Sequence, residues 1–216
     1  MNKLNVLYED NHIIVVEKKP NVLSQSDITK DLDLLSMVKE YIKEKYNKPG
    51  NVYIGLVHRL DRPVGGIMVF ARTSKAAKRL SKMIQNKEVL KEYLLICRGG
   101  ISGNGIMEDY LEKSDTKSII SNKEKGKYSM LEYEVLKTID DLNLVKVNLL
   151  TGRHHQIRVQ FSSRGNSLYG DQLYGVNDKK QIALYAYHLK FRHPVKDEIM
   201  DFKLFPKGGI WDVFLK

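Results

Sequence analysis

The chain has 216 residues, and its 36 lysines and arginines against 26 aspartates and glutamates give it a formal net charge of +10. Hydrophobic residues make up 42% of the sequence, enough for a sizeable core, which excludes a disordered polycation. The positive balance favours a polyanionic partner such as nucleic acid or an anionic membrane surface.

The chain opens with two predicted strands and a helix. The strands are expected at residues 6–7 and 13–17, on either side of a polar turn. Apolar side chains then recur at helical spacing over residues 34–46, which predicts an amphipathic helix. Either Asp31 or Asp33 is placed to cap its first turn.

Two further strands and a second helix follow. The strands are expected at residues 52–57 and 66–71, and Ser74 is a good N-cap for the helix after them. Apolar side chains line one face of this helix at helical spacing, which indicates the face that is buried. The opposite face is basic and carries Lys75, Lys78, Arg79 and Lys82.

Beyond residue 90 the chain is predominantly β. The glycine-rich segment at residues 99–105 lacks the Lys-Ser/Thr pair of a phosphate-binding loop, and we interpret it as a hairpin turn. A short helix is expected at residues 155–161. Few helices and strands in hairpins predict an α+β fold with a mixed, largely antiparallel sheet, in a single domain over residues 1–216. Strands are expected at residues 93–97, 131–135, 145–149, 183–191 and 199–205.

Cys97 is the chain's one cysteine, so an internal disulfide is impossible and a reducing, cytoplasmic location is expected. It ends the apolar run at residues 93–97, which favours a buried, inert thiol over a nucleophile. The longest apolar runs are strand-sized, far below the roughly 20 residues of a membrane-spanning helix. We therefore expect no membrane association.

The excess positive charge is concentrated in two stretches. Residues 58–98 carry ten basic side chains against three acidic ones, and residues 151–170 carry three arginines and no acid. The basic face of the second helix would by itself suit a solvated surface. Because both stretches also hold charged residues at unusual places, we favour a surface that follows the phosphates of a nucleic acid.

Asp61 occupies an unusual position. It lies between Arg59 and Arg62, directly after an apolar strand and before a loop that Pro63 and two glycines make tight. Catalytic groups are often found in loops that rigid elements position, but a surface ion pair is the plain alternative. The pattern alone leaves both interpretations open.

Residues 151–159 form a second dense site, with many hydrogen-bond donors and no counter-charge. An arginine on the short helix, such as Arg158, could reach Asp61. The adjacent His154 and His155 suggest metal ligands, but neighbouring side chains do not face together on a helix or strand. Because the chain has no other His or Cys pair at metal-ligand spacing, we expect no metal site.

Four segments, in order along the chain, resemble the motifs of the RluA-type pseudouridine synthases. Together they extend the resemblance over about residues 5–205. A lone His-Arg-Leu-Asp would be a weak signal, whereas four ordered motifs make a chance match very unlikely. The segments are Leu7–Pro20, His58-Arg-Leu-Asp-Arg62 running on to Thr73, Lys91-Glu92-Tyr93, and Thr151–Arg158 followed by Gly170–Gly175.

The resemblance implies isomerisation of uridine in RNA to pseudouridine, without cofactor or metal. It assigns Asp61 as the catalytic carboxylate, acting as nucleophile or base, and pairs Arg158 with it. It also places Tyr93 under the uracil and Arg59 in the space that the flipped nucleotide leaves. With charge and donor density added, the expected RNA-binding residues are Arg59, Arg62, Lys75, Lys78, Arg79, Lys82, Arg153, His155 and Gln156.

The chain departs from the family pattern in two ways. Gly65 stands where the family commonly has serine, which removes a hydroxyl but no catalytic group. Many members carry an N-terminal RNA-binding domain, whereas this chain starts almost at the catalytic core, so RNA recognition is expected from the core surface.

We expect a monomer that acts on ribosomal RNA, transfer RNA or both. The alternatives are a non-catalytic RNA-binding protein on the same fold and a metal-dependent nuclease, which the lack of a carboxylate cluster disfavours.

Overall fold

A computed structural model describes residues 4–28 and 31–216, which form eleven strands and four helices. The chain divides into two compact units. Unit 1 comprises the chain up to Val89 and residues 188–204, and unit 2 comprises residues 90–187 and 205–216.

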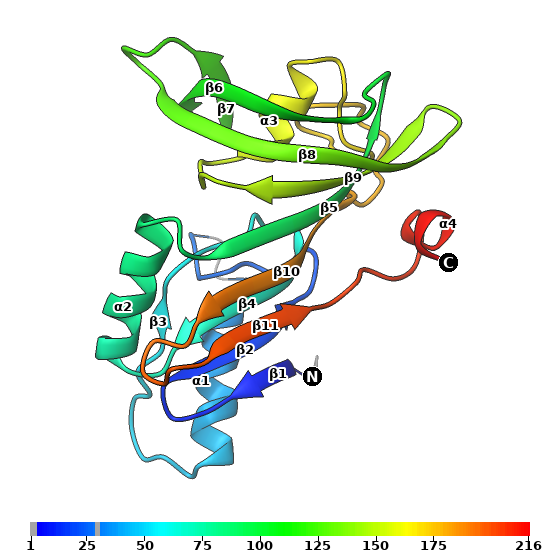
Figure 1. Cartoon of the computed structure of the whole chain (residues 1–216). Coiled ribbons are helices and arrows are strands. Elements are labelled where there is room, and N and C mark those ends of the chain that lie inside the picture. Colours follow the sequence, from blue (N-terminus) through cyan, green and yellow to red (C-terminus); the bar gives the residue numbers. More distant parts are fainter. Residues whose placement is uncertain (1–3, 29–30) are drawn as a thin grey trace. The chain divides into compact units, whose positions relative to one another are not determined.

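Unit 1 is a largely antiparallel sheet with two helices (Figure 1). In the order β1-β2-β4-β10, β2 pairs antiparallel with both β1 and β4, while β11 pairs antiparallel with β10 and β3 with the end of β4. The elements are β1 (Asn5–Glu9), β2 (Ile13–Lys18), α1 (Leu34–Lys45), β3 (Gly55–Leu56), β4 (Gly65–Ala71), α2 (Ser74–Gln85), β10 (Leu184–Arg192, within unit 1 from His188) and β11 (Ile199–Lys203).

The core of unit 1 lies between its sheet and α2. Side chains from β2, β4, β10 and β11 pack with Ala76 and Leu80 of α2 in one buried apolar cluster. The predicted apolar face of this helix is confirmed, because Ala77, Met83 and Ile84 also pack against the cluster. Removing this apolar surface from water is the main force that holds α2 to the sheet.

Two details of unit 1 differ from the expectations. The N-cap of α2 is Thr73, whose hydroxyl accepts a hydrogen bond from the Ala76 amide, so Ser74 is the first helical residue rather than the cap. Only residues 55–56 of the predicted 52–57 strand pair with β4. The physical reason is that β2 occupies one edge of β4, while β3 shares the other edge with β10. For α1, the structure selects Asp33 as the cap.

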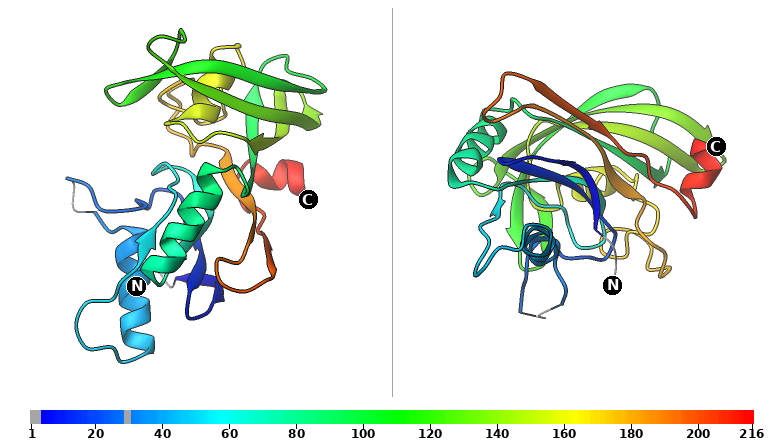
Figure 2. Two further views of the ribbon diagram at one scale, coloured as in Figure 1. Left: turned by 60° about the vertical axis from the view of Figure 1, so that its left-hand side comes forward. Right: turned by 90° about the horizontal axis from the view of Figure 1, so that it is seen from below.

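Unit 2 is built mainly from long antiparallel ribbons, seen in green in Figure 2. Its strand order is β10-β5-β9-β8-β6-β7. The strands predicted at residues 131–135 and 145–149 and the short helix predicted at residues 155–161 are confirmed; the two strands form the β8–β9 hairpin. The elements are β5 (Leu90–Arg98), β6 (Asn104–Ser114), β7 (Lys117–Ser121), β8 (Lys127–Ile139), β9 (Leu142–Leu149), α3 (Gln156–Ser162), the first part of β10 and α4 (Trp211–Leu215).

The glycine-rich segment at residues 99–105 is not a hairpin turn, so that prediction is wrong. It connects β5 to β6, which do not pair, because β5 lies beside β9 and β6 beside β8. Gly99 and Gly103 have positive φ angles of 100° and 63°, which glycine adopts without strain. At Gly99, an added Cβ would also lie 2.7 Å from the Gly165 carbonyl oxygen.

Cys97 is fully buried in β5, and burial raises the pKa of its thiol to about 12. The expectation of a buried, inert cysteine is therefore confirmed. None of the helices in the described ranges has the length and hydrophobicity that a bilayer crossing requires.

Candidate active site

Asp61 lies in the loop between β3 and β4 of unit 1, where its side chain is half-buried. Its carbonyl oxygen accepts a hydrogen bond from the Val64 amide at 3.0 Å, which closes a tight turn across Pro63. On the other side, the buried Ser24 hydroxyl donates to the Leu60 carbonyl at 2.7 Å and accepts from the Leu60 amide at 3.1 Å. These bonds fix the backbone on both sides of the carboxylate.

Lys18 is buried beneath the same loop. Its side chain is fully inaccessible, and its ammonium group donates to the carbonyl oxygens of Val22 at 2.5 Å and Arg62 at 2.9 Å. Burial lowers the pKa of Lys18 to about 7, although the negative charge of Asp61 acts in the opposite direction. The hydrogen bond from this buried ammonium group to the Arg62 carbonyl therefore stabilises the loop that carries Asp61 and Arg62.

The two arginines beside Asp61 are exposed. Arg62 forms an ion pair with Asp31 at 2.7 Å, with both side chains about half exposed. Other charges of the basic stretch are also paired: buried Arg72 bonds Glu9 at 2.9 Å, and Arg98 bonds Asp141 at 3.0 Å. The stretch therefore presents fewer unpaired cations than its composition suggests.

The basic face of α2 is exposed, as predicted. The guanidinium of Arg79 donates to the carbonyl oxygen of Pro194 at 2.7 Å, which ties the helix to the β10–β11 turn. Lys75, Lys78 and Lys82 are the lysines of this face. Their role in RNA binding stays a prediction.

Tyr93 lies in β5 of unit 2, opposite Val147 of β9, and is 8% exposed. Lys91, two residues earlier on the same strand, is half-buried. Because side chains two residues apart on a strand point to the same face, Lys91 and Tyr93 share one face of the sheet. Glu92 points to the other face, where the Tyr187 hydroxyl donates to its carboxylate at 3.0 Å.

Arg158 on α3 is held by a buried partner that the sequence did not reveal. Its Nε and Nη2 atoms donate to the two carboxylate oxygens of Asp171 at 2.8 and 2.7 Å, and the two side chains are 6% and 0% exposed. Asp171 in turn accepts hydrogen bonds from the amides of Leu173 and Tyr174. This two-point bridge fixes the plane of the guanidinium group.

Gln156 is buried and its amide is engaged within the chain. Its Oε1 accepts from the Thr151 hydroxyl at 2.8 Å and from the Arg153 amide at 3.1 Å, and its Nε2 donates to the Met130 carbonyl at 3.1 Å. Gln156 therefore shapes the turn that presents the exposed Arg153. An additional role of Gln156 in RNA binding stays a prediction.

His154 and His155 belong to a hydrogen-bonded network of unit 2. Their rings stack with centroids 3.7 Å apart, and His155 has a left-handed φ of 52° directly before α3. His155 Nδ1 lies 3.0 Å from the Tyr174 hydroxyl, which accepts from the Ser118 amide at 2.6 Å. The Ser118 hydroxyl donates to the His154 carbonyl at 2.7 Å. These contacts hold both histidines in place at the start of α3.

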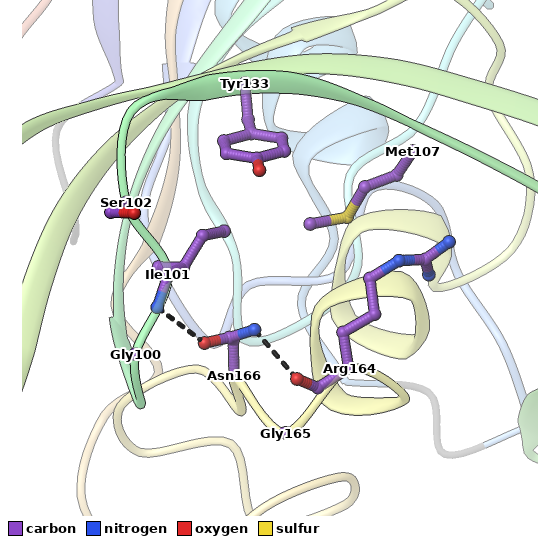
Figure 3. A pocket seen from close by; sticks show the side chains of 8 residues that line it. All are labelled: Gly100, Ile101, Ser102, Met107, Tyr133, Arg164, Gly165 and Asn166. Atoms are coloured by element: carbon purple, nitrogen blue, oxygen red, sulfur yellow. Dashed lines mark hydrogen bonds between the residues drawn. The ribbon is translucent and has the colours of Figure 1, made fainter.

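A polar pocket of about 480 Å³ lies elsewhere in unit 2 (Figure 3). It contains none of the predicted site residues. The guanidinium of Arg164 lies at the pocket wall and forms an ion pair with the Asp109 carboxylate at 2.9 Å. Arg164 therefore brings no unpaired positive charge to the pocket. Its lining residues are Gly100, Ile101, Ser102, Met107, Tyr133, Arg164, Gly165 and Asn166.

The structure thus places Asp61, Arg59 and Arg62 in unit 1, and Tyr93, Arg158 and His155 in unit 2. The pairing of Asp61 with Arg158 stays a prediction. Within residues 4–28 and 31–216, no three His, Cys, Asp or Glu side chains come together as a metal site would require.

Comparison with known proteins identifies the family. A family model for RNA pseudouridylate synthase matches residues 12–163. An uncharacterized RNA pseudouridine synthase of Aquifex aeolicus is 34% identical, over 93% of this chain and 69% of that protein. Ribosomal large subunit pseudouridine synthase D of Vibrio cholerae is 31% identical, over 92% of this chain and 66% of that protein. The chain thus spans about two thirds of the length of these relatives.

Solved structures show the same fold. Human RNA pseudouridylate synthase domain containing 4 has a TM-score of 0.78 at 18% identity, over 93% of this chain and 88% of that one. Human RNA pseudouridylate synthase domain containing 1 has a TM-score of 0.75 at 24% identity, over 94% and 84%. The expected fold class is confirmed. With the family model and the relatives, it follows that this chain belongs to the RluA-type family of RNA pseudouridine synthases, isomerases that convert uridine in RNA to pseudouridine.

Proposed function

We propose that this chain converts uridine to pseudouridine in ribosomal RNA, with Asp61 as the catalytic carboxylate. The observation that carries the proposal is the position of Asp61. It is half-buried in a loop whose backbone accepts hydrogen bonds from the side chains of Ser24 and Lys18. Relatives named as ribosomal large subunit pseudouridine synthases support ribosomal RNA as the substrate.

The reaction divides its tasks among a few side chains. The target nucleotide must leave the base stack to be reached, and Arg59 fills the space that it vacates. Asp61 acts on the ribose as nucleophile or base while the glycosidic N–C bond breaks. Arg158 pairs with Asp61 and keeps it oriented and charged. Tyr93 stacks under the detached uracil, which turns so that its C5 forms a C–C bond with the ribose C1′. Where Asp61 acts as nucleophile, its bond to C1′ breaks as this bond forms. The proton on C5 then leaves and N1 takes up a proton, so the reaction is a net isomerisation.

The proposal is tested by replacing the carboxylate. Asp61→Asn should lower pseudouridine formation on unmodified ribosomal RNA by at least about 10³-fold, while RNA binding stays close to wild type. Asp197→Asn is the matched control, because Asp197 is an aspartate of the same unit whose side chain is 92% exposed. Single-turnover pseudouridine assays and filter binding measure the two effects. Normal turnover in the Asp61→Asn variant would show that the assignment is wrong.

The RNA class is tested separately. Pseudouridine should disappear from one or more positions of ribosomal RNA in cells that lack this protein. Carbodiimide-based mapping of total RNA, with and without the protein, measures this directly. Loss confined to transfer RNA would overturn ribosomal RNA as the substrate while leaving the activity itself intact.

A further inference from the structure

Lys91 is a half-buried lysine of unit 2 that takes no part in the proposed reaction. Burial lowers the pKa of its ammonium group, and no neighbouring carboxylate offsets that effect. Within the described ranges, no hydrogen bond or ion pair engages its Nζ atom. A partly desolvated ammonium group without a counter-ion is costly, and an anion from outside the chain would remove that cost.

The Nζ atom of Lys91 lies close to Gly152. A Cβ built on Gly152 would lie 3.7 Å from Lys91 Nζ, so the ammonium group sits beside the turn that follows β9. Gly152 and Arg153 are exposed, so the turn beside the ammonium group faces solvent. On β5, Lys91 also shares a face with Tyr93.

The acidic side chains nearest in sequence, Glu88 and Glu92, and Asp171 just after the acid-free stretch do not neutralise Lys91. Glu88 accepts a hydrogen bond from the Asn86 amide at 2.9 Å. Glu92 points to the opposite face, where it bonds Tyr187. Asp171 is engaged by Arg158 at two points. The whole stretch of residues 151–170 contains no acid. None of these carboxylates pairs with Lys91, so its charge is available to an anion.

We propose that Lys91 binds a backbone phosphate of the RNA, close to the nucleotide that stacks on Tyr93. The proposal rests on the proposed function, because the phosphodiester is the anionic group that an RNA substrate offers. The charged ammonium group and the phosphate favour one another, so RNA binding stabilises the protonated form of Lys91. Lys91 is thus a binding residue with no part in bond breaking.

The test measures RNA affinity against salt. In an Asp61→Asn background, which prevents turnover, Lys91→Met should reduce the slope of log K against log [KCl] by about 0.7–0.9, the value of one phosphate contact. Lys91→Arg should keep the wild-type slope. Lys146→Met is the matched control, since Lys146 lies on neighbouring β9 and pairs with Glu134 at 2.6 Å. The probe is unmodified transcribed large-subunit ribosomal RNA.

A slope for Lys91→Met equal to that for Lys146→Met would overturn the proposal. Thermal unfolding of each variant checks the fold, and Lys91→Gln gives a second neutral variant if methionine disturbs β5. A second readout is the pKa of Lys91, measured by ¹³C NMR of labelled lysines. This pKa should rise when RNA binds, and an unchanged value would also contradict the proposal. If wild type forms pseudouridine while the slopes stay equal, this inference alone fails. If the slope falls but no pseudouridine forms, the proposed function fails and the phosphate contact stands.

Discussion

The ammonium group of Lys18 is held by carbonyl oxygens, at 2.5 Å from Val22, 2.9 Å from Arg62 and 3.3 Å from Lys19. Carbonyl dipoles replace only part of the hydration that a charged amine loses on burial, so its pKa falls to about 7. This side chain joins the segment after β2 to the loop that carries Asp61. A residue remote in sequence therefore supports the position of the proposed catalytic carboxylate.

Lys18 makes the stability of the protein depend on pH. Its folded pKa of about 7 lies below the ordinary value of 10.5, so between these values the unfolded chain binds more protons. The free energy of unfolding should therefore rise with pH through this window. Relative to Lys18→Met, wild type should gain about 3 kcal/mol between pH 6.5 and 9.5. Urea denaturation at several pH values measures the difference.

The control for this prediction is Lys19→Met. The Lys19 side chain is 58% exposed and forms a surface ion pair with Glu17, so its removal should leave the pH dependence of stability nearly unchanged. Parallel pH profiles for wild type and Lys18→Met would contradict the assigned pKa.

The motifs single out some residues of the candidate site and leave others unmarked. Asp61, Tyr93 and Arg158 could be named because they occupy motifs. Lys18 could not be singled out, because its burial depends on a loop more than 40 residues away along the chain. For the same reason the motif that contains Asp171 does not show that this residue is the partner of Arg158. Such contacts are fixed by tertiary structure, which local patterns do not encode.

The second helix shows how much of an element a periodic pattern predicts. Its apolar face is buried and its basic face is exposed, both as predicted. The cap was misplaced by one residue because Thr73 and Ser74 are adjacent, and both can cap a helix. The backbone decides between them, since Thr73 is extended and Ser74 is already helical.

The lysines of α2 should contribute to RNA affinity through charge. Replacing Lys75, Lys78 and Lys82 by glutamine is expected to reduce the salt slope of RNA binding by about 2–3, because each phosphate contact contributes about 0.7–0.9. Arg79 is left intact because its guanidinium bonds Pro194. Filter binding at several salt concentrations measures the slope.

The matched control removes three exposed lysines from and just after α1. Lys39, Lys43 and Lys48 are changed to glutamine, which lowers the net charge by the same amount. If both triple variants lose the same slope, the effect is one of total charge, and the basic face of α2 has no special role.

The strands that sequence reasoning missed have a physical explanation. β6 and β7 carry apolar side chains that face solvent, among them Ile106, Ile119 and Ile120, which are 57%, 46% and 40% exposed. The order of apolar and polar residues in these strands therefore does not show which face is buried. β8 and β9 were found because their buried residues alternate and a two-residue turn separates them.

At the scale of the whole molecule, the two compact units are interleaved along the chain. Unit 1 is interrupted after Val89 and is completed only by residues 188–204. Those residues supply Leu189, Phe191 and Met200 to its buried apolar cluster. Burying each such side chain contributes roughly 1.5–3 kcal/mol. Together they are worth about 5–9 kcal/mol, comparable with the whole stability of a typical domain.

A fragment that ends at Val89 should therefore not fold, although it holds β1 to β4 and both helices of unit 1. It keeps the Asp61 loop but lacks β10, the strand that follows β4 in the sheet order, so the part of that edge of β4 that β3 does not cover would be left unpaired. Because neither unit is a continuous piece of chain, the full protein should unfold in one cooperative transition, as the single-domain prediction requires. Calorimetry of the full chain and amide NMR of the fragment provide the measurements. A dispersed spectrum for the fragment, or two separate transitions in the full chain, would show that unit 1 is a domain of its own.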